Sequence, residues 1–179
     1  MRRTLIIVVG LAWMVAVGAP SPEAAPIDAG RERAWTHTRP LTPSAADLVS
    51  YAAARAPAVC ALLETLEQSD VVVYVTDEMS GLTNEPSAYL RFVSRAAGLR
   101  YLLVQVARWD VSPTDRVAWL AHELQHAVEI ARAPDVQDNA SVARLYRQIG
   151  WQSGRGRFET SEARWVGRLA RFQLGERPR

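Results

Sequence analysis

The chain contains no lysine, one cysteine and three histidines among its 179 residues. Because Cys60 has no second cysteine to pair with, an intrachain disulfide is excluded, and the apolar residues around it indicate a buried, inert thiol. The 21 basic residues are all arginine and face 19 acidic residues. Apolar residues make up 49% and charged residues 22% of the chain, a globular composition that excludes wholesale disorder. The length suits one domain.

The apolar run at the N-terminus is too short to span a membrane as a helix. Leu5–Ala19 holds fifteen residues, whereas a spanning helix needs about 20. The run follows Arg2 and Arg3 and precedes small residues, which predicts a secretory signal peptide over residues 1–18, with cleavage as late as residue 24 as an alternative. An uncleaved anchor is the competing interpretation. We therefore expect an exported protein, periplasmic or extracellular, without a stable membrane span after cleavage.

The charge of the mature chain argues against nucleic acid as a partner. Removal of residues 1–18 takes away two arginines and no acidic residue, so 19 basic residues then face 19 acidic ones. A chain with no net charge has little long-range attraction for a phosphate backbone. The last 28 residues carry seven arginines against three glutamates, and this excess favours a solvated helix face over a binding surface for anionic polymers.

Apolar periodicity and turn-forming residues predict an α+β domain over residues 44–174. A flexible, proline-rich leader over 19–43 precedes it, and a tail over 175–179 follows. We expect a short mixed or antiparallel sheet of about three strands, packed on one central helix with flanking helices. The predicted strands cover residues 71–76, 89–94 and 100–108, and the predicted helices cover 44–54, 57–68, 113–131, 140–149 and 159–174.

The helix over 113–131 has the clearest boundaries and carries the sequence His-Glu-x-x-His at residues 122–126. Residues i and i+4 share one face of a helix, so His122 and His126 can converge on one Zn²⁺. Glu123 lies about 100° around the helix from His122, on the side where water would bind the metal. We therefore expect Glu123 to act as a general base.

His122, Glu123 and His126 resemble the motif of the zincin metallopeptidases. The metzincin branch is excluded, because Glu129 and Arg132 stand where that branch has a glycine and a third histidine. The gluzincin branch takes its third ligand from a glutamate on a later helix. That resemblance implies Glu159 as the third zinc ligand and Glu162 as the residue that orients the first histidine, with Glu162 as an alternative ligand.

Glu129 is a rival third ligand on geometric grounds. It shares a helix face with His122 and His126, but it lies about 4.5 Å beyond His126 along the helix axis. This offset favours a supporting contact to the histidines over direct ligation.

The sequence thus predicts an exported zinc metallopeptidase that acts on a peptide or protein substrate. The resemblance gives the strand over 100–108 the role of an edge strand that holds the substrate by β-pairing. Tyr146 and Arg155 are both open as the donor that stabilises the oxyanion. The alternative is a non-catalytic zinc-binding envelope protein that acts as a binding or assembly module. The presence of Glu123 favours the enzyme, because a structural zinc site needs no general base.

Overall fold

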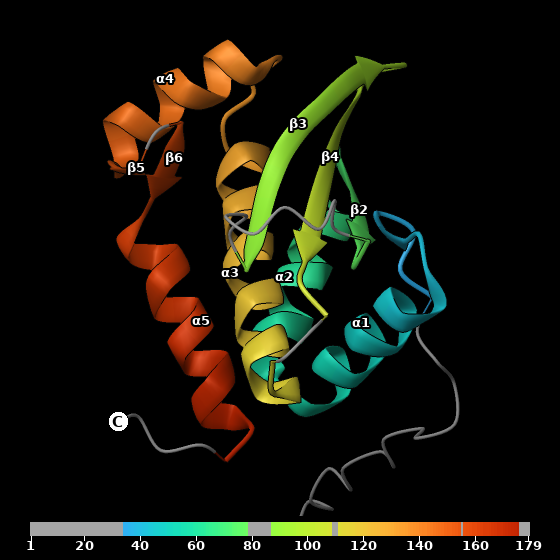
Figure 1. The fold of residues 1–179 in the computed structure, drawn as a ribbon. Helices are drawn as coiled ribbons and strands as arrows, with labels where there is room; N and C mark the ends of the chain where they lie inside the picture. Colours follow the sequence, from blue (N-terminus) through green and yellow to red (C-terminus); the bar gives the residue numbers. More distant parts are fainter. Residues whose placement is uncertain (1–33, 79–86, 109–110, 155, 176–179) are drawn as a thin grey trace, which may run out of the picture. The chain divides into compact units, whose positions relative to one another are not determined.

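The computed structural model describes residues 34–78, 87–108, 111–154 and 156–175 (Figure 1). The predicted signal peptide and most of the predicted leader lie outside this part of the chain. Within it the expected α+β class is confirmed, with a mixed four-stranded sheet, a small hairpin and five helices. The strands are β1 (Thr38–Pro40), β2 (Val71–Thr76), β3 (Ala88–Ala96), β4 (Leu99–Val106), β5 (Trp151–Gly154) and β6 (Arg157–Glu159). The helices are α1 (Pro43–Arg55), α2 (Pro57–Glu67), α3 (Pro113–Ala131), α4 (Asn139–Ile149) and α5 (Ser161–Gln173).

Helices α1 and α2 both begin at prolines; α2 begins at Pro57 as predicted, whereas α1 begins at Pro43, one residue before the predicted start. The Thr42 hydroxyl accepts a hydrogen bond from the Ala45 amide at 3.1 Å and so caps α1. Ala56 is extended because it precedes Pro57, and this residue separates the two helices. No single helix in the described ranges is long and apolar enough to cross a membrane, and α1 and α2 reach that length only as a pair bent by 112°. Both helices turn buried aliphatic residues toward the core: Leu48, Val49, Val59, Leu62, Leu63 and Leu66.

The main sheet has the order β1-β2-β4-β3. Strands β1, β2 and β4 run parallel, and β3 runs antiparallel to β4. Along β4 the residues Leu102, Val104 and Val106 are buried in the core, whereas Tyr101 and Leu103 on the other face are half-buried. This alternation is typical of a strand with one buried face and one half-exposed face.

The predicted leader contains a strand that the sequence pattern did not reveal. Thr38 of β1 pairs with Val73 of β2, and the Leu41 amide donates to the Val75 carbonyl at 2.8 Å. The sheet therefore has four strands where about three were predicted. A strand of three residues is too short to show an alternating pattern, and its hydrogen-bond partners lie far away in the sequence.

Strand β4 is not an edge strand, which corrects the role that the resemblance gave to residues 100–108. It lies between β2 and β3, so both of its sides are hydrogen-bonded. The edge strand next to the motif helix is β3, which reaches β4 through a hairpin turn at Ala97 and Gly98. Both turn residues have positive φ, 50° and 80°, as a two-residue turn between twisted strands requires.

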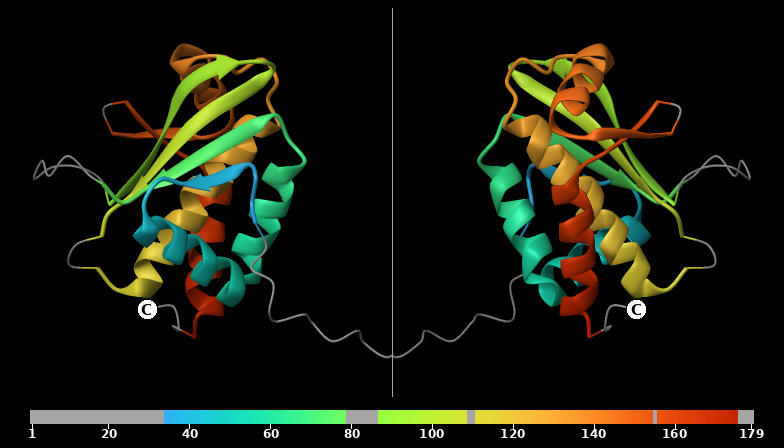
Figure 2. Two further views of the ribbon diagram at one scale, coloured as in Figure 1. Left: turned by 90° about the vertical axis from the view of Figure 1, so that its right-hand side faces the viewer. Right: turned by 90° about the vertical axis from the view of Figure 1, so that its left-hand side faces the viewer.

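The structure also moves the start of the last helix. Helix α5 begins at Ser161, because the Thr160 hydroxyl accepts from the Ala163 amide at 3.1 Å. Glu159 is therefore the last residue of β6 and not the first residue of a helix. Figure 2 shows β5 and β6 as a hairpin beside α4, where the sequence predicted only a loop. Strands this short carry no clear sequence signal.

Helix α3 lies at the centre of the domain, in contact with β2, β3 and β4 as well as α1, α2 and α5. Its C-terminal end is held by the buried side chain of Arg100, which donates to the carbonyls of Ile130 at 2.8 Å and Ala133 at 2.7 Å. The same guanidinium pairs with Asp70, its Nε 2.8 Å from a carboxylate oxygen. This fork links the first residues of β4 to the end of the motif helix and satisfies carbonyls that the helix leaves unpaired.

Candidate metal centre

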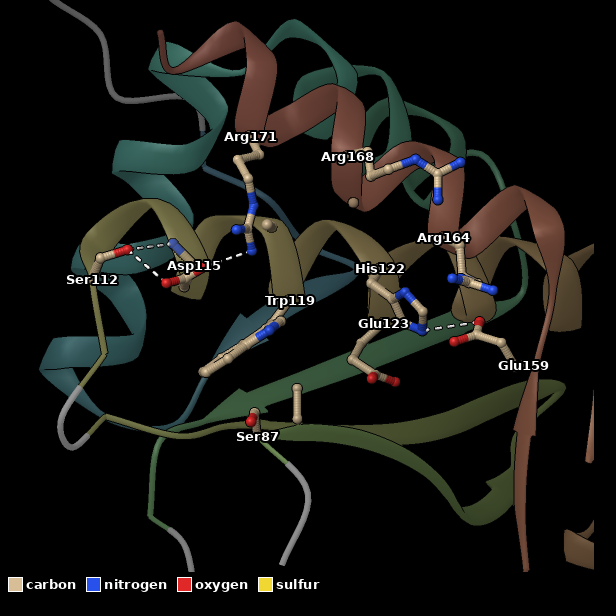
Figure 3. Close-up of a pocket in the computed structure, with 13 residues that line it drawn as sticks. Ser87, Ser112, Asp115, Trp119, His122, Glu123, Glu159, Arg164, Arg168 and Arg171 are labelled. Atoms are coloured by element: carbon tan, nitrogen blue, oxygen red, sulfur yellow. Dashed lines mark hydrogen bonds and ion pairs between the residues drawn. The ribbon is translucent and has the colours of Figure 1, made fainter. Parts of the chain in front are cut away.

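The structure brings His122, His126 and Glu159 together. The two histidines lie one turn apart on α3. Glu159 approaches them from the end of β6, and Figure 3 shows its carboxylate facing the ring of His122. One oxygen of Glu159 lies 3.4 Å from Nε2 of His122 and 3.9 Å from Nε2 of His126. One ligand atom from each of the three residues falls within 4.8 Å of the others. The three side chains therefore form a group that could hold a metal ion.

The spacing of these atoms fits a small tetrahedral cation. Zn²⁺ binds imidazole nitrogen and carboxylate oxygen at about 2.0–2.2 Å, which puts neighbouring ligand atoms of a tetrahedral site about 3.3 Å apart. The observed 3.4 and 3.9 Å are close to that value. The separations within the group reach 4.8 Å, so the ligand atoms must move closer together to share one ion. Two histidines and one glutamate are also a donor set found in catalytic zinc sites, which keep one position open.

Glu129 contacts His126 at Nδ1, the ring nitrogen that is not the one nearest to Glu159. Nδ1 of His126 lies 2.8 Å from one carboxylate oxygen of Glu129. Because a carboxylate only accepts hydrogen bonds, Nδ1 carries a proton, and in the neutral ring Nε2 keeps its lone pair for a metal. The hydroxyl of Thr160 donates to the other oxygen of Glu129 at 2.7 Å. Glu129 is therefore not one of the three converging residues. It contacts a histidine of the group instead, in agreement with its offset along α3.

Glu162 lies away from the group. It is exposed on the first turn of α5 and contributes no atom to the three-residue cluster. The partner of a ligand histidine is Glu129, on the motif helix itself. The role that the resemblance gave to Glu162, which is to orient His122, stays a prediction.

Two residues that the sequence analysis did not single out position the site. Thr160 caps α5 and also holds Glu129, so one hydroxyl ties the start of α5 to the ligand His126. Gly150 lies so close to β6 that a Cβ added to it would be 2.1 Å from the carbonyl oxygen of Glu159. A threonine before an apolar helical pattern is a detectable cap signal. The Gly150 contact joins two segments and has no local signal.

Burial sets the protonation of the site in the absence of a metal. Burial, with the neighbouring charge of His126, lowers the pKa of His122 to about 4, so its ring is neutral at pH 7. Burial likewise raises the pKa of Glu123 to about 7. For His126 burial favours the neutral ring, but the hydrogen bond that the ring donates to Glu129, together with the negative charges of Glu123, Glu129 and Glu159, outweighs burial and raises the pKa.

The two residues left open as oxyanion donors have different outcomes. Tyr146 is buried, and its hydroxyl donates to the carbonyl of His126 at 3.0 Å. Burial, with the nearby carboxylates of Glu129 and Glu123, raises the pKa of Tyr146 well above its ordinary value. Arg155 lies outside the described residues. The tyrosine is thus close to the centre, but its proton is already engaged.

Two pockets open on either side of the three-residue group. One, of about 1060 Å³, lies along α3 and α5, and the other, of about 910 Å³, lies between β3, α4 and the β5–β6 hairpin. Both are lined by His122, Glu123 and Glu159, and Ala88 of the edge strand β3 reaches both. The centre therefore lies where two adjoining hollows meet.

Comparisons with models of protein families, with curated proteins and with solved structures gave no significant match. The candidate metal site therefore rests on its residues and their geometry alone.

Proposed function

We propose that this protein is an exported zinc-dependent peptidase of the gluzincin type. The observation that carries the proposal is the approach of Glu159 to the Nε2 atoms of His122 and His126, at 3.4 and 3.9 Å. Three protein ligands leave one position of a tetrahedral ion for a substrate or a water molecule. A purely structural zinc site usually has four protein ligands, and no fourth histidine, cysteine or carboxylate in the described residues joins this group.

Glu123 has the place of a general base in this proposal. It follows His122 on α3, and its carboxylate lines both pockets. Zn²⁺ would supply Lewis acidity, which lowers the pKa of a water molecule and polarises a peptide carbonyl. Glu123 then accepts the proton of the attacking water and passes it to the nitrogen of the leaving amine. Its buried position keeps the carboxylate close to the reacting groups and away from bulk water.

The edge strand β3 suits an extended peptide. One of its two sides is free of strand partners in the described residues, and residues from Ala88 to Phe92 line the pocket beside α4. A peptide added to this edge would form backbone hydrogen bonds that do not depend on its sequence. It would pass from one pocket to the other across the metal centre. This geometry supports a peptide substrate more than a small compact one.

A specific observation favours the alternative, a non-catalytic zinc-binding envelope protein. The hydroxyl of Tyr146, the one described candidate for stabilising the oxyanion, already donates to the carbonyl of His126. With this hydroxyl engaged, stabilisation of the oxyanion would fall to the metal or to another donor. Both functions require the metal site, but only the peptidase requires Glu123, as its general base.

Substitution of Glu123 tests the proposal. Wild type and Glu123→Gln are purified from the envelope fraction, analysed for zinc and incubated with casein as a general substrate. We expect both to bind zinc and only the wild type to release peptides, because a glutamine cannot accept the proton. Glu162→Gln, an equal change at an exposed carboxylate, serves as the control and should keep activity. Zinc-loaded wild type without hydrolysis would favour the non-catalytic alternative.

A further inference from the structure

The two pockets beside the metal centre are lined by more basic than acidic side chains. Their described linings hold six arginines against three carboxylates, an excess of three positive charges. The predicted mature chain has no net charge, so this excess of positive charge is a local property of the residues that line the two pockets. The arginines are Arg91, Arg147, Arg157, Arg164, Arg168 and Arg171, and the carboxylates are Asp115, Glu123 and Glu159.

Three of these arginines form one row along α5. Arg164, Arg168 and Arg171 follow each other at intervals of four and three residues, which places them on one helix face. The opposite face of α5 is buried through Val166 and Ala170. All three arginines line the larger pocket together with the metal-site residues, and Figure 3 shows Arg168 between the other two.

The three arginines differ in their partners. Arg171 forms an ion pair with Asp115, so the two charges balance. Arg164 has its guanidinium over the ring of Trp151, 5.9 Å from the ring centre, a contact that leaves its positive charge uncompensated. Arg168 is exposed and forms no hydrogen bond or ion pair with any residue in the described part of the chain. The row therefore ends near the candidate metal centre with two cations, neither of which forms an ion pair with a carboxylate among the described residues.

We propose that Arg168 and Arg164 form a subsite for a carboxylate of the substrate, so that the enzyme prefers peptides with an acidic group near the scissile bond. This inference rests on the proposed peptidase function and adds the class of substrate. A guanidinium matches a carboxylate in shape and charge, because its N–H groups can donate to both oxygens at once. The carboxylate comes either from an aspartate or glutamate side chain or from the C-terminus of the peptide.

The expected preference is modest, because both arginines are exposed. An ion pair at the surface contributes up to about 1 kcal/mol, which corresponds to a preference of about fivefold. Such an interaction is screened by salt, so the preference should shrink between about 0.05 M and about 0.5 M NaCl. A residue that only supports the fold would not produce a salt-dependent substrate preference.

The test uses two sets of octapeptides built from alanine and leucine. Each peptide of the first set has one glutamate, placed at a different position from peptide to peptide, and the matched set has glutamine at the same positions. Each peptide is made with a free and with an amidated C-terminus, and kcat/KM is measured with the zinc-loaded protein. We expect about fivefold faster cleavage when a carboxylate occupies one position relative to the scissile bond. If glutamate peptides are cleaved faster than glutamine peptides whatever the C-terminus, the carboxylate belongs to a side chain. If peptides with a free C-terminus are cleaved faster than amidated ones whatever the side chain, the carboxylate is the C-terminus.

Variants connect the preference to the row on α5. Arg168→Gln should abolish the preference, and Arg168→Glu should reverse it in favour of glutamine peptides. Arg144→Gln is the matched control, because Arg144 is exposed on α4 and lines neither pocket. The inference would be overturned if wild type and Arg168→Gln showed the same preference, or if the wild type cleaved both peptide sets equally fast. Hydrolysis in either case would still support the proposed function.

A binding measurement separates this inference from the proposed function. Fluorescein-labelled versions of the same peptides are titrated with zinc-loaded Glu123→Gln protein, with and without Arg168→Gln, and anisotropy is recorded. Tighter binding of glutamate peptides that depends on Arg168 supports the subsite even if the wild type cleaves no peptide. Binding that does not distinguish glutamate from glutamine, or no binding at all, contradicts it.

Discussion

Replacement of Gly150 by alanine should displace Glu159 and weaken metal binding. Gly150 is not itself a candidate ligand, and the effect would act through the backbone of Glu159. A Cβ at this position would lie 2.1 Å from the carbonyl oxygen of Glu159 and 3.1 Å from Cγ2 of Thr160. Non-bonded contacts of this kind normally exceed about 3 Å, so the end of β6 must retreat by about 1 Å. The carboxylate oxygen of Glu159 already lies 3.4 and 3.9 Å from the histidine nitrogens. The retreat should therefore lower zinc affinity by about 10–100-fold, as for other changes that misplace a ligand.

Competition with a chromophoric chelator measures this affinity, and thermal melting of the metal-free protein shows whether the fold persists. Gly154→Ala is the matched control in the same hairpin, because its Cβ would meet only the Arg157 side chain at 3.7 Å. It should bind zinc like the wild type. A folded Gly150→Ala protein with wild-type zinc affinity would refute the claim that this close approach positions Glu159.

Two further predictions concern the residues that support the centre and the domain. Glu129→Gln should lower zinc affinity by about 10–100-fold in chelator competition, because Glu129 accepts from Nδ1 of His126, whereas Glu162→Gln at an exposed site should leave it unchanged. Asp70→Asn should lower the melting temperature at pH 7 by a few degrees, since it leaves the buried Arg100 without its carboxylate. The hydrogen bond from Arg100 holds the pKa of Asp70 below its ordinary value of 3.8, so this stabilisation is complete above about pH 4 and is lost at lower pH. The difference in melting temperature should therefore close in acid, and equal melting temperatures at pH 7 would contradict the role of the pair.

The motif helix could be predicted from the sequence because its signals are local. Ser112 accepts a hydrogen bond from the Asp115 amide at 3.0 Å, as a cap at that position should. The apolar residues around His122 and His126 repeat with the helical period and are buried. These features act within a few residues of each other, so the fold does not override them.

The features that the sequence did not predict depend on contacts between distant segments. Strand β1 is defined by its pairing with β2, and the position of β3 at the sheet edge follows from the strand order. Glu159 was selected as a ligand through a resemblance, while its place at the end of β6 depends on the Thr160 cap. The Gly150 contact similarly joins the end of α4 to β6. No periodicity or motif encodes such pairings, because they are determined by packing.

The most direct test of the metal centre is the zinc content of the purified protein and of its ligand variants, measured by mass spectrometry of the metal after gel filtration. The wild type should hold about one zinc ion per chain, and Glu123→Gln should hold the same amount. His126→Ala should lose the ion, because it removes a nitrogen of the converging group. Glu159→Gln should bind the ion more weakly, because a neutral amide replaces the carboxylate. Stoichiometric zinc in His126→Ala, or a wild type that binds none, would contradict the site described here.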